Sequence, residues 1–295
     1  ALFSIVLSIL AFDISVSLSN MSVRSLFRKV PQSKLGVSEP HPSWFGNPGN
    51  EATNPKWTNK NWLKSRFHFS FAEYSNPRNT GFGVLRVMND DLVQPNRGFG
   101  EHPHRDTEIC TYVVEGELTH ADSMGTEETL SRGAIQFMTA GSGVTHSEHN
   151  LNHNDPLRFI QIWINTRQRG LKPNYGSFAG SAEGRRNKWA HLVSDVKANF
   201  DTPIKINQDA NIHVAEVSAG NSVEFHVQAG RQGYLLMMEG KGKVSGGHGE
   251  EVLDRHDAAE VYGENRFTVT PEQGSDSAHV LFVEMAYTGA GRTDL

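Results

Sequence analysis

The chain lacks several features that would define a class of protein. It has one cysteine, Cys110, among 295 residues, which excludes an internal disulfide framework and a cysteine-rich zinc module. Its 28 Lys and Arg against 33 Asp and Glu give a net charge of −5, so no overall positive field attracts nucleic acid. No apolar run reaches the ~20 residues of a transmembrane helix. We therefore expect a globular chain that does not span a membrane or bind nucleic acid directly.

The first residues form a short apolar segment. Residues 2–12 have about the length of a signal-peptide core, and small residues follow at 15, 17 and 19, but no Lys or Arg precedes the segment. Residues 21–36 are basic and free of acid, as in a transit sequence. Two interpretations follow: a secretory or organellar leader, or an extension before a working start at Met21, which predicts a cytoplasmic or nuclear protein. Residues 1–20 are excluded from fold prediction.

From Phe67 onward, short apolar runs alternate with turn residues. The runs are rich in Val, Ile, Phe, Tyr and Trp, which favours β-strands. They form two series, at 67–74, 81–90, 108–122, 134–141 and 157–166, and then at 211–220, 222–230, 233–246, 258–271 and 279–287. No stretch longer than about 12 residues has a clean helical period. The sequence predicts an all-β protein with two β-barrel, jelly-roll-like domains.

The two series resemble each other at a constant offset. Residues 112–116 (YVVEG) align with 236–240 (LMMEG), and 133–137 align with 257–261, both at an offset of 124 residues. An internal duplication is therefore expected. It predicts an N-terminal segment at 21–60, a first domain at 61–170, a Gly- and Lys-containing linker at 171–207 and a second domain at 208–295.

Two histidine-containing stretches carry the chemical signal. Residues i and i+2 of a strand share a face, so His102 and His104 point the same way, and Glu108 keeps their parity. In the second stretch His146 and Glu148 share a face. If antiparallel strands bring the stretches together, three imidazoles and one carboxylate surround one point. Such ligands suit first-row metals, iron above all where open positions remain, and also zinc.

The spacing of these residues resembles the cupin pattern. Residues 102–108 (HPHRDTE) fit its first motif, H-x-H-x3-E, and residues 146–150 (HSEHN) fit the end of its second. Two departures are Thr139, where the second motif usually has proline, and a longer spacing between 141 and 146. These two departures are typical of the pirin family, which the sequence also resembles in the phrases GFGEHPHRDTEICTYVVEGELTHADSMG and QFMTAGSGVTHSEHN. The resemblance is strongest to bacterial-type pirins assayed as quercetin dioxygenases.

The resemblance implies a ligand set. In pirins the metal is held by the residues that match His102, His104, His146 and Glu148, which leaves Glu108 as an alternative ligand or as a partner that orients a histidine. The second barrel has no matching set, so it should carry no complete site. The implied metal is Fe(II), with zinc, nickel, manganese, copper or cobalt as alternatives.

The resemblance also implies an activity. A mononuclear non-haem metal would let the protein cleave a flavonol, such as quercetin or a related catechol, with molecular oxygen. Glu148 would act as ligand and base, while Phe99, Met138 and Arg105 are candidates for the substrate pocket. The alternative is a non-catalytic, iron-dependent redox sensor of the nuclear pirin type, with a transcription factor as partner. Family members are often monomers, and we expect a monomer here.

Overall fold

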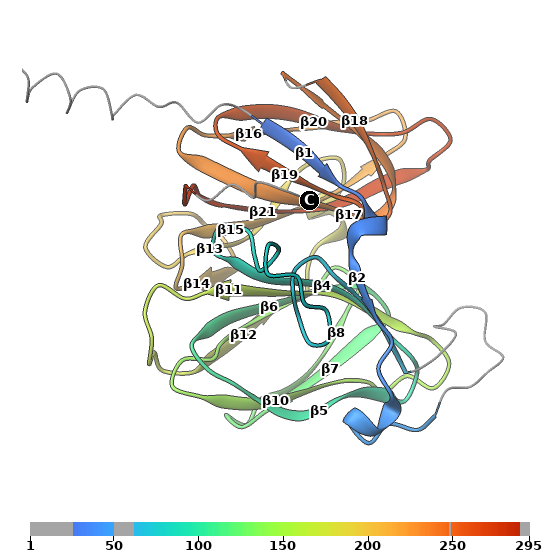
Figure 1. Ribbon diagram of the computed structural model, residues 1–295, viewed down its shortest axis with the longest axis vertical. Helices are drawn as coiled ribbons and strands as arrows, with labels where there is room; N and C mark the ends of the chain where they lie inside the picture. The colour runs from blue at the N-terminus through green and yellow to red at the C-terminus, as the bar shows by residue number, and fades with distance from the viewer. Residues whose placement is uncertain (1–25, 50–61, 248, 290–295) are drawn as a thin grey trace, which may run out of the picture.

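The computed structural model describes residues 26–49, 62–247 and 249–289. Strands dominate it, and they form two barrel-like domains, one above the other (Figure 1). The predicted all-β fold with two barrels is confirmed. None of the helices in these residues is long and apolar enough to cross a membrane. The N-terminal apolar segment and Met21 lie outside the described residues.

The first barrel consists of two sheets that face each other. The larger sheet has the order β12-β9-β6-β11-β4-β3-β2, and the smaller sheet has the order β5-β10-β7-β8. The larger sheet contains β2 (Gly36–Ser38), β3 (Leu63–Phe67), β4 (Leu85–Val93), β6 (Thr107–Glu115), β9 (Ile135–Thr139), β11 (Leu157–Asn165) and β12 (Asn174–Phe178). The smaller sheet contains β5 (Arg97–His104), β7 (Glu117–Asp122), β8 (Glu127–Ser131) and β10 (Val144–Asn150).

The second barrel is built around the long strand β17. Its main path is β1-β19-β17-β21-β15-β13-β14, and β16, β18 and β20 join through β17 and β20. These strands are β1 (Leu26–Val30), β13 (Ala190–Asp195), β14 (Ile204–Ile206), β15 (Ala210–Ser218), β16 (Val223–Val227), β17 (Arg231–Gly246), β18 (Gly249–Asp254), β19 (Ala258–Tyr262), β20 (Asn265–Pro271) and β21 (Ser277–Ala286). The short helices are η1 (Gln32–Lys34), η2 (Pro42–Trp44) and α2 (Ala182–Arg185).

The N-terminal segment joins both barrels. Strand β1 pairs antiparallel with β19 of the second barrel, and Arg28 and Lys29 form ion pairs with Glu260 and Asp257 there. The chain then descends to β2 in the first barrel (Figure 1). The stretch 171–207, predicted as a linker, contributes β12 to the first barrel and β13 and β14 to the second. Both segments that connect the domains therefore contribute strands to each barrel.

One predicted strand is shifted. The stretch 67–74 was expected to be extended, but β3 ends at Phe67 and the chain turns after it. Ala72 has a positive φ of 47°, and Phe71 and Tyr74 bond to each other through their backbones. Apolar and aromatic content alone does not separate a strand from such a turn.

The duplication is visible in a pair of glycines. Gly116 and Gly240, which align at the offset of 124 residues, have φ values of 78° and 74°. A Cβ on Gly116 would lie 2.3 Å from the carbonyl oxygen of Pro156, and one on Gly240 would lie 1.9 Å from that of Ser277. Both glycines therefore allow the end of a strand to approach a neighbouring backbone closely, which a side chain would prevent.

Replacing Gly116 with Ala should destabilise the protein more than replacing Gly220. Both residues have positive φ, which costs Ala ~1 kcal/mol, but Gly220 has open space around its Cβ position. The clash at Gly116 should add about 2 kcal/mol. Urea unfolding of the two variants beside the wild type tests this, and equal losses would show that the close approach does not matter.

The two barrels pack through the outer faces of their larger sheets. One continuous apolar cluster combines residues of the first barrel with residues of the second, among them Tyr112, Ile162, Leu236 and Leu281, all of which are completely buried. Tyr112 bonds to His279 across the interface (Oη to Nε2, 3.0 Å). In the opposite direction, Tyr234 Oη lies 2.9 Å from His68 Nδ1. The interface is thus both apolar and specifically bonded.

Buried charges also cross this interface. Arg158 binds Asp90 through two hydrogen bonds of 2.8 and 2.7 Å, and His256 of the second barrel lies 2.6 Å from the same carboxylate. At the edge, Glu239 accepts from His279 (2.7 Å) and Arg132 (2.7 Å). Burial acts to raise the pKa of Glu239, but these donors lower the pKa to about 2.

Acid should weaken the interface through Glu239. Its pKa falls from 4.5 to about 2 on folding, so it stabilises the native state above pH 4.5 and loses this effect as the pH falls towards 2. A Glu239→Gln variant should be less stable than the wild type at pH 7, and the difference should shrink on acidification. Thermal unfolding between pH 7 and pH 3 measures it; a constant difference would contradict the assignment.

Candidate metal centre and its cavity

The pairing of β10 with β5 brings the histidines together. His146 lies directly opposite His102, and Val144 lies opposite His104, in antiparallel register. Along β5 the side chains alternate between solvent and the barrel interior, with Glu101 and Pro103 exposed and both histidines turned inward. The predicted parity of His102 and His104 is therefore seen in the structure. A register shift between His146 and Glu148 then sets Glu148 opposite Phe99.

The three imidazoles face one another at ligand distance. One ring nitrogen from each of His102, His104 and His146 lies within 4.8 Å of the other two, and the ring centroids are 4.6–4.8 Å apart. His146 is 2% exposed, and neither of its nitrogens has a hydrogen-bond partner. A buried nitrogen without a partner is costly. A metal ion would satisfy it, so these residues fit the ion that the sequence predicts.

The histidines have the protonation state that a metal needs. Burial lowers the pKa of all three histidines. Together with the neighbouring imidazoles, burial lowers the pKa of His104 to about 4 and that of His146 to about 2. His102 Nδ1 lies 2.7 Å from the carbonyl oxygen of Gly100, to which it can donate, leaving Nε2 with its lone pair. Neutral imidazoles are the form that coordinates metals.

Glu148 lies in the same barrel but is held by neutral donors. Oε1 accepts from Thr111 (3.1 Å) and Gln136 (3.0 Å), and Oε2 accepts from Gln161 (2.8 Å). These three residues lie side by side on β6, β9 and β11. Burial still raises the pKa of Glu148 to about 7. Glu148 is not part of the group of convergent ligand atoms that the three histidines form, so its role as a fourth ligand remains a prediction.

Glu108 faces away from the histidines. The chain turns between β5 and β6 at Asp106, where φ is 51°, and this turn ends the alternation on which the parity of Glu108 rested. Glu108 is completely buried; it accepts a hydrogen bond from Thr139 (2.8 Å) and lies 3.4 Å from Asn207 Nδ2. The structure therefore does not bring Glu108 into the histidine cluster.

A cavity of about 210 Å³ opens beside the histidines. Its wall is mainly aromatic and includes Phe45, Trp62, Phe71, Phe99 and Trp163, together with His102, His104 and Glu148. The Trp163 ring meets the His104 ring edge to face at 4.8 Å. An apolar slot with a few convergent polar groups is the usual form of a small-molecule site.

The cavity also contains polar residues that the sequence did not reveal. Asp91 and Ser65 lie opposite each other on β4 and β3 and are joined by a hydrogen bond; Gln161 and Asn89 complete the polar side. Burial, with the nearby charges of Asp90 and Glu148, raises the pKa of Asp91 to about 8. At neutral pH this carboxyl therefore retains its proton and can donate a hydrogen bond.

The three residues predicted for the substrate pocket differ in whether they line the cavity. Phe99 lines the cavity. Met138 does not, because it packs into a separate apolar cluster with Ile109 and Val144. Arg105 does not either; its side chain is 73% exposed and lies 3.8 Å from Asp106 on the outer side of the barrel. Met138 and Arg105 are thus not among the residues that line this cavity.

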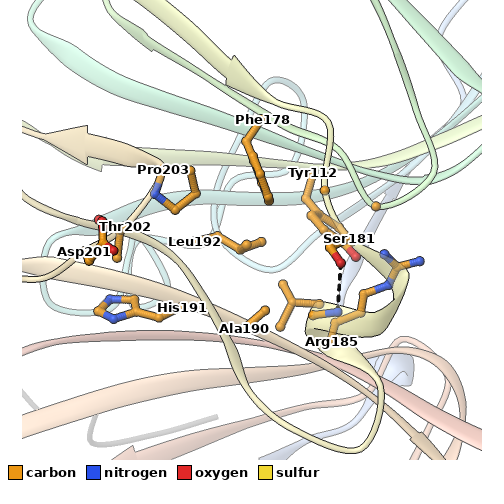
Figure 2. Close-up of a pocket in the computed structure, with 14 residues that line it drawn as sticks. Tyr112, Phe178, Ser181, Arg185, Ala190, His191, Leu192, Asp201, Thr202 and Pro203 are labelled. Atoms are coloured by element: carbon orange, nitrogen blue, oxygen red, sulfur yellow. Dashed lines mark hydrogen bonds between the residues drawn. The ribbon is translucent and has the colours of Figure 1, made fainter.

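A second cavity, of about 370 Å³, lies between the barrels (Figure 2). It is walled by Tyr112, Phe178 and Leu192 and shares no residue with the histidine cavity. Its polar groups are already bonded: the Ser181 hydroxyl accepts from the backbone of Gly184 (2.9 Å), and Arg185 binds Glu216 (3.0 Å). The histidine cavity, with unpartnered nitrogens, is the better candidate site.

The second barrel has a different interior. Apolar side chains fill it, including Leu235, Phe225, Phe267 and Phe282. Throughout the described ranges, the histidines at 102, 104 and 146 are the single group of three or more His, Cys, Asp or Glu at ligand distance.

Comparison with known proteins identifies the family. A family model described as pirin matches residues 50–164, and one described as the quercetinase C-terminal cupin domain matches residues 192–285. A pirin-like protein of Caulobacter vibrioides is 37% identical over 76% of this chain and 93% of its own length. The chain belongs to the pirin family. The predicted resemblance is thus confirmed, and the two barrels of this pirin correspond to its two cupin domains.

Other relatives extend the comparison. A quercetin 2,3-dioxygenase of Escherichia coli K12 is 34% identical to this pirin over 76% of the chain and 92% of its own length. The crystal structure of YhhW from Escherichia coli superposes with a TM-score of 0.73 at 27% identity, covering 90% of this chain and all of that one. A structure of the same bacterial pirin in complex with nickel(II) has a TM-score of 0.70 at 27% identity, over 88% and 99% of the two chains.

The two carboxylates should differ in their effect on metal binding by this pirin. Glu148→Gln removes the negative charge that faces the cavity and should weaken Fe(II) binding 10- to 100-fold. Glu108→Gln changes a group that points away from the histidines and should change the affinity less than threefold, within the ordinary effect of a distant substitution. Anaerobic titration with a competing chelator measures both. Equal losses would contradict the assignment of Glu148.

Proposed function

We propose that this pirin is a mononuclear non-haem iron dioxygenase that acts on flavonols or related catechols. The observation that carries the proposal is the meeting of three uncharged, inward-facing imidazoles with an aromatic cavity. The relatives named quercetin 2,3-dioxygenase support the same reaction class. A flat aromatic substrate matches the chemistry of the cavity wall, because rings stack edge to face and offset at such walls.

In this proposal His102, His104, His146 and Glu148 hold the ion. When bound, Fe(II) supplies a positive charge that favours the anionic form of a substrate hydroxyl and open positions for oxygen chemistry. The burial of the histidines keeps them unprotonated and therefore available as ligands.

Glu148 is also the proposed base. Its carboxyl lines the cavity, and its pKa of about 7 means that it takes up a proton more readily than an exposed carboxylate. The amides of Gln136 and Gln161 hold the carboxylate in place, 3.0 and 2.8 Å from its oxygens. The proton of a substrate hydroxyl would therefore pass to Glu148 at a fixed position in the cavity.

The remaining cavity residues would orient the substrate. Phe99, Trp62 and Phe45 contact one another edge to face at 5.1–5.9 Å and form a rigid apolar wall. The protonated Asp91 and the Ser65 hydroxyl would bind a substrate oxygen away from the metal. Water would be displaced from the apolar wall on binding, which strengthens the polar contacts that remain.

Oxygen uptake tests the proposal. The Fe(II)-loaded protein should consume oxygen when quercetin is added, and His102→Ala should lose at least 100-fold of this rate, since a ligand is removed. His153→Ala, on an exposed loop, should keep it. Stoichiometric iron without oxygen uptake in the wild type would contradict the proposal and favour a redox-responsive binding protein.

A further inference from the structure

Strand β7 contributes a histidine to the back of the metal centre. It pairs with β10 on the side opposite to β5, so that His120 faces Glu148 and Asp122 faces His146. His120 is completely buried. The His120 and His146 rings are neighbours, with centroids 5.3 Å apart and planes tilted by 54°. None of the roles described so far uses His120.

Asp122 determines which ring nitrogen of neutral His120 carries the hydrogen. Asp122 Oδ1 accepts hydrogen bonds from the backbone of Met124 (2.9 Å) and Thr126 (3.1 Å). Its other oxygen, Oδ2, lies 3.0 Å from His120 Nε2. Since a carboxylate only accepts, Nε2 of a neutral His120 carries the hydrogen and Nδ1 has a free lone pair. This Nδ1 is buried and has no hydrogen-bond partner.

His146 has the complementary requirement. A neutral histidine that binds a metal through one nitrogen carries a hydrogen on the other, and this N–H normally meets an acceptor. His102 has such an acceptor in Gly100. Both nitrogens of His146 lack one, and the neighbouring ring of His120 offers a bare nitrogen. A linear N–H···N bond sets two imidazole centroids about 5 Å apart. The observed 5.3 Å is close to this, although in this structure the two rings are tilted by 54° and no hydrogen bond joins them.

We propose that Asp122 and His120 are positioning residues that orient His146 for metal binding. Asp122 holds His120 with its hydrogen on Nε2, and once a metal is bound the N–H of His146 would turn towards the bare Nδ1 of His120, which would accept it. The proposed chain of contacts thus runs from the buried carboxylate of Asp122, at the end of β7, through His120 to the metal ligand. The inference rests on the metal site of the proposed function but not on its substrate.

Three substitutions separate positioning from packing. His120→Phe keeps a ring that can stack on Tyr175, which lies 4.6 Å from His120, but removes the acceptor. His120→Asn keeps an acceptor oxygen near the place of Nδ1. Asp122→Asn hardly changes shape, yet its oxygen is required by the two backbone N–H groups, so its NH2 faces Nε2 and drives the hydrogen to Nδ1.

The measurement is the affinity for Co(II), determined by competition with a chelator. His120→Phe and Asp122→Asn should weaken binding 10- to 100-fold, and His120→Asn should weaken it less than tenfold. His153→Phe, in the exposed loop, serves as the matched control and should bind like the wild type. Full affinity in both His120→Phe and Asp122→Asn would overturn the inference, as would equal losses in His120→Phe and His120→Asn.

A second readout does not depend on the stability of any variant. In protein labelled with ¹⁵N-histidine and loaded with Zn(II), the ring nitrogen shifts should show His120 with hydrogen on Nε2. In Asp122→Asn the hydrogen should move to Nδ1. Hydrogen on Nδ1 in the wild type would overturn the inference. Because neither experiment contains a flavonol, failure of the dioxygenase proposal would appear separately, as normal metal binding without oxygen uptake.

Discussion

The site depends on the antiparallel register between β10 and β5. This register sets His146 opposite His102, and the two-residue period of β5 places His104 on the same face. A slip by one residue would turn the side chains of β10 to the outside of the barrel. The register is supported on both sides, since β10 is held between β5 and β7. The imidazoles thus meet where burial keeps them uncharged, and both nitrogens of His146 are left without a hydrogen-bond partner. Neutral imidazoles are the form that binds a metal.

The interiors of the two barrels differ. The interior of the first contains a polar row, Gln136, Thr111 and Gln161, that fixes Glu148, whereas the interior of the second is filled with apolar side chains. Their outer faces share one apolar core, joined by the hydrogen bonds Tyr112–His279 and Asp90–His256. Asp90 and Asp91 are consecutive on β4, so one strand serves both: Asp90 secures the interface and Asp91 lines the cavity. The second barrel therefore packs against the same sheet of the first barrel that supplies part of the cavity wall.

Local patterns in the sequence predicted what depends on local geometry. Alternation along β5 and β10 predicted the three histidines, and the 124-residue offset predicted the matched glycines 116 and 240. The same parity rule failed for Glu108 because one residue, Asp106, turns the chain. The place of Asp91 in the cavity and the pairing of β1 with the second barrel could not be predicted, because both depend on pairings between distant strands. Periodicity gives the face of a strand but not its neighbours.

We propose that three neutral histidines and Glu148 of the first barrel form one iron site. X-ray absorption at the iron edge of the anaerobic Fe(II)-loaded protein, at one equivalent of metal, counts the imidazoles around the ion. We expect three imidazoles around the iron, together with a shell of oxygen ligands that changes in Glu148→Gln. Two or fewer imidazoles, or a spectrum unchanged by His146→Ala, would contradict it, because the iron would then be bound elsewhere or by another set of residues.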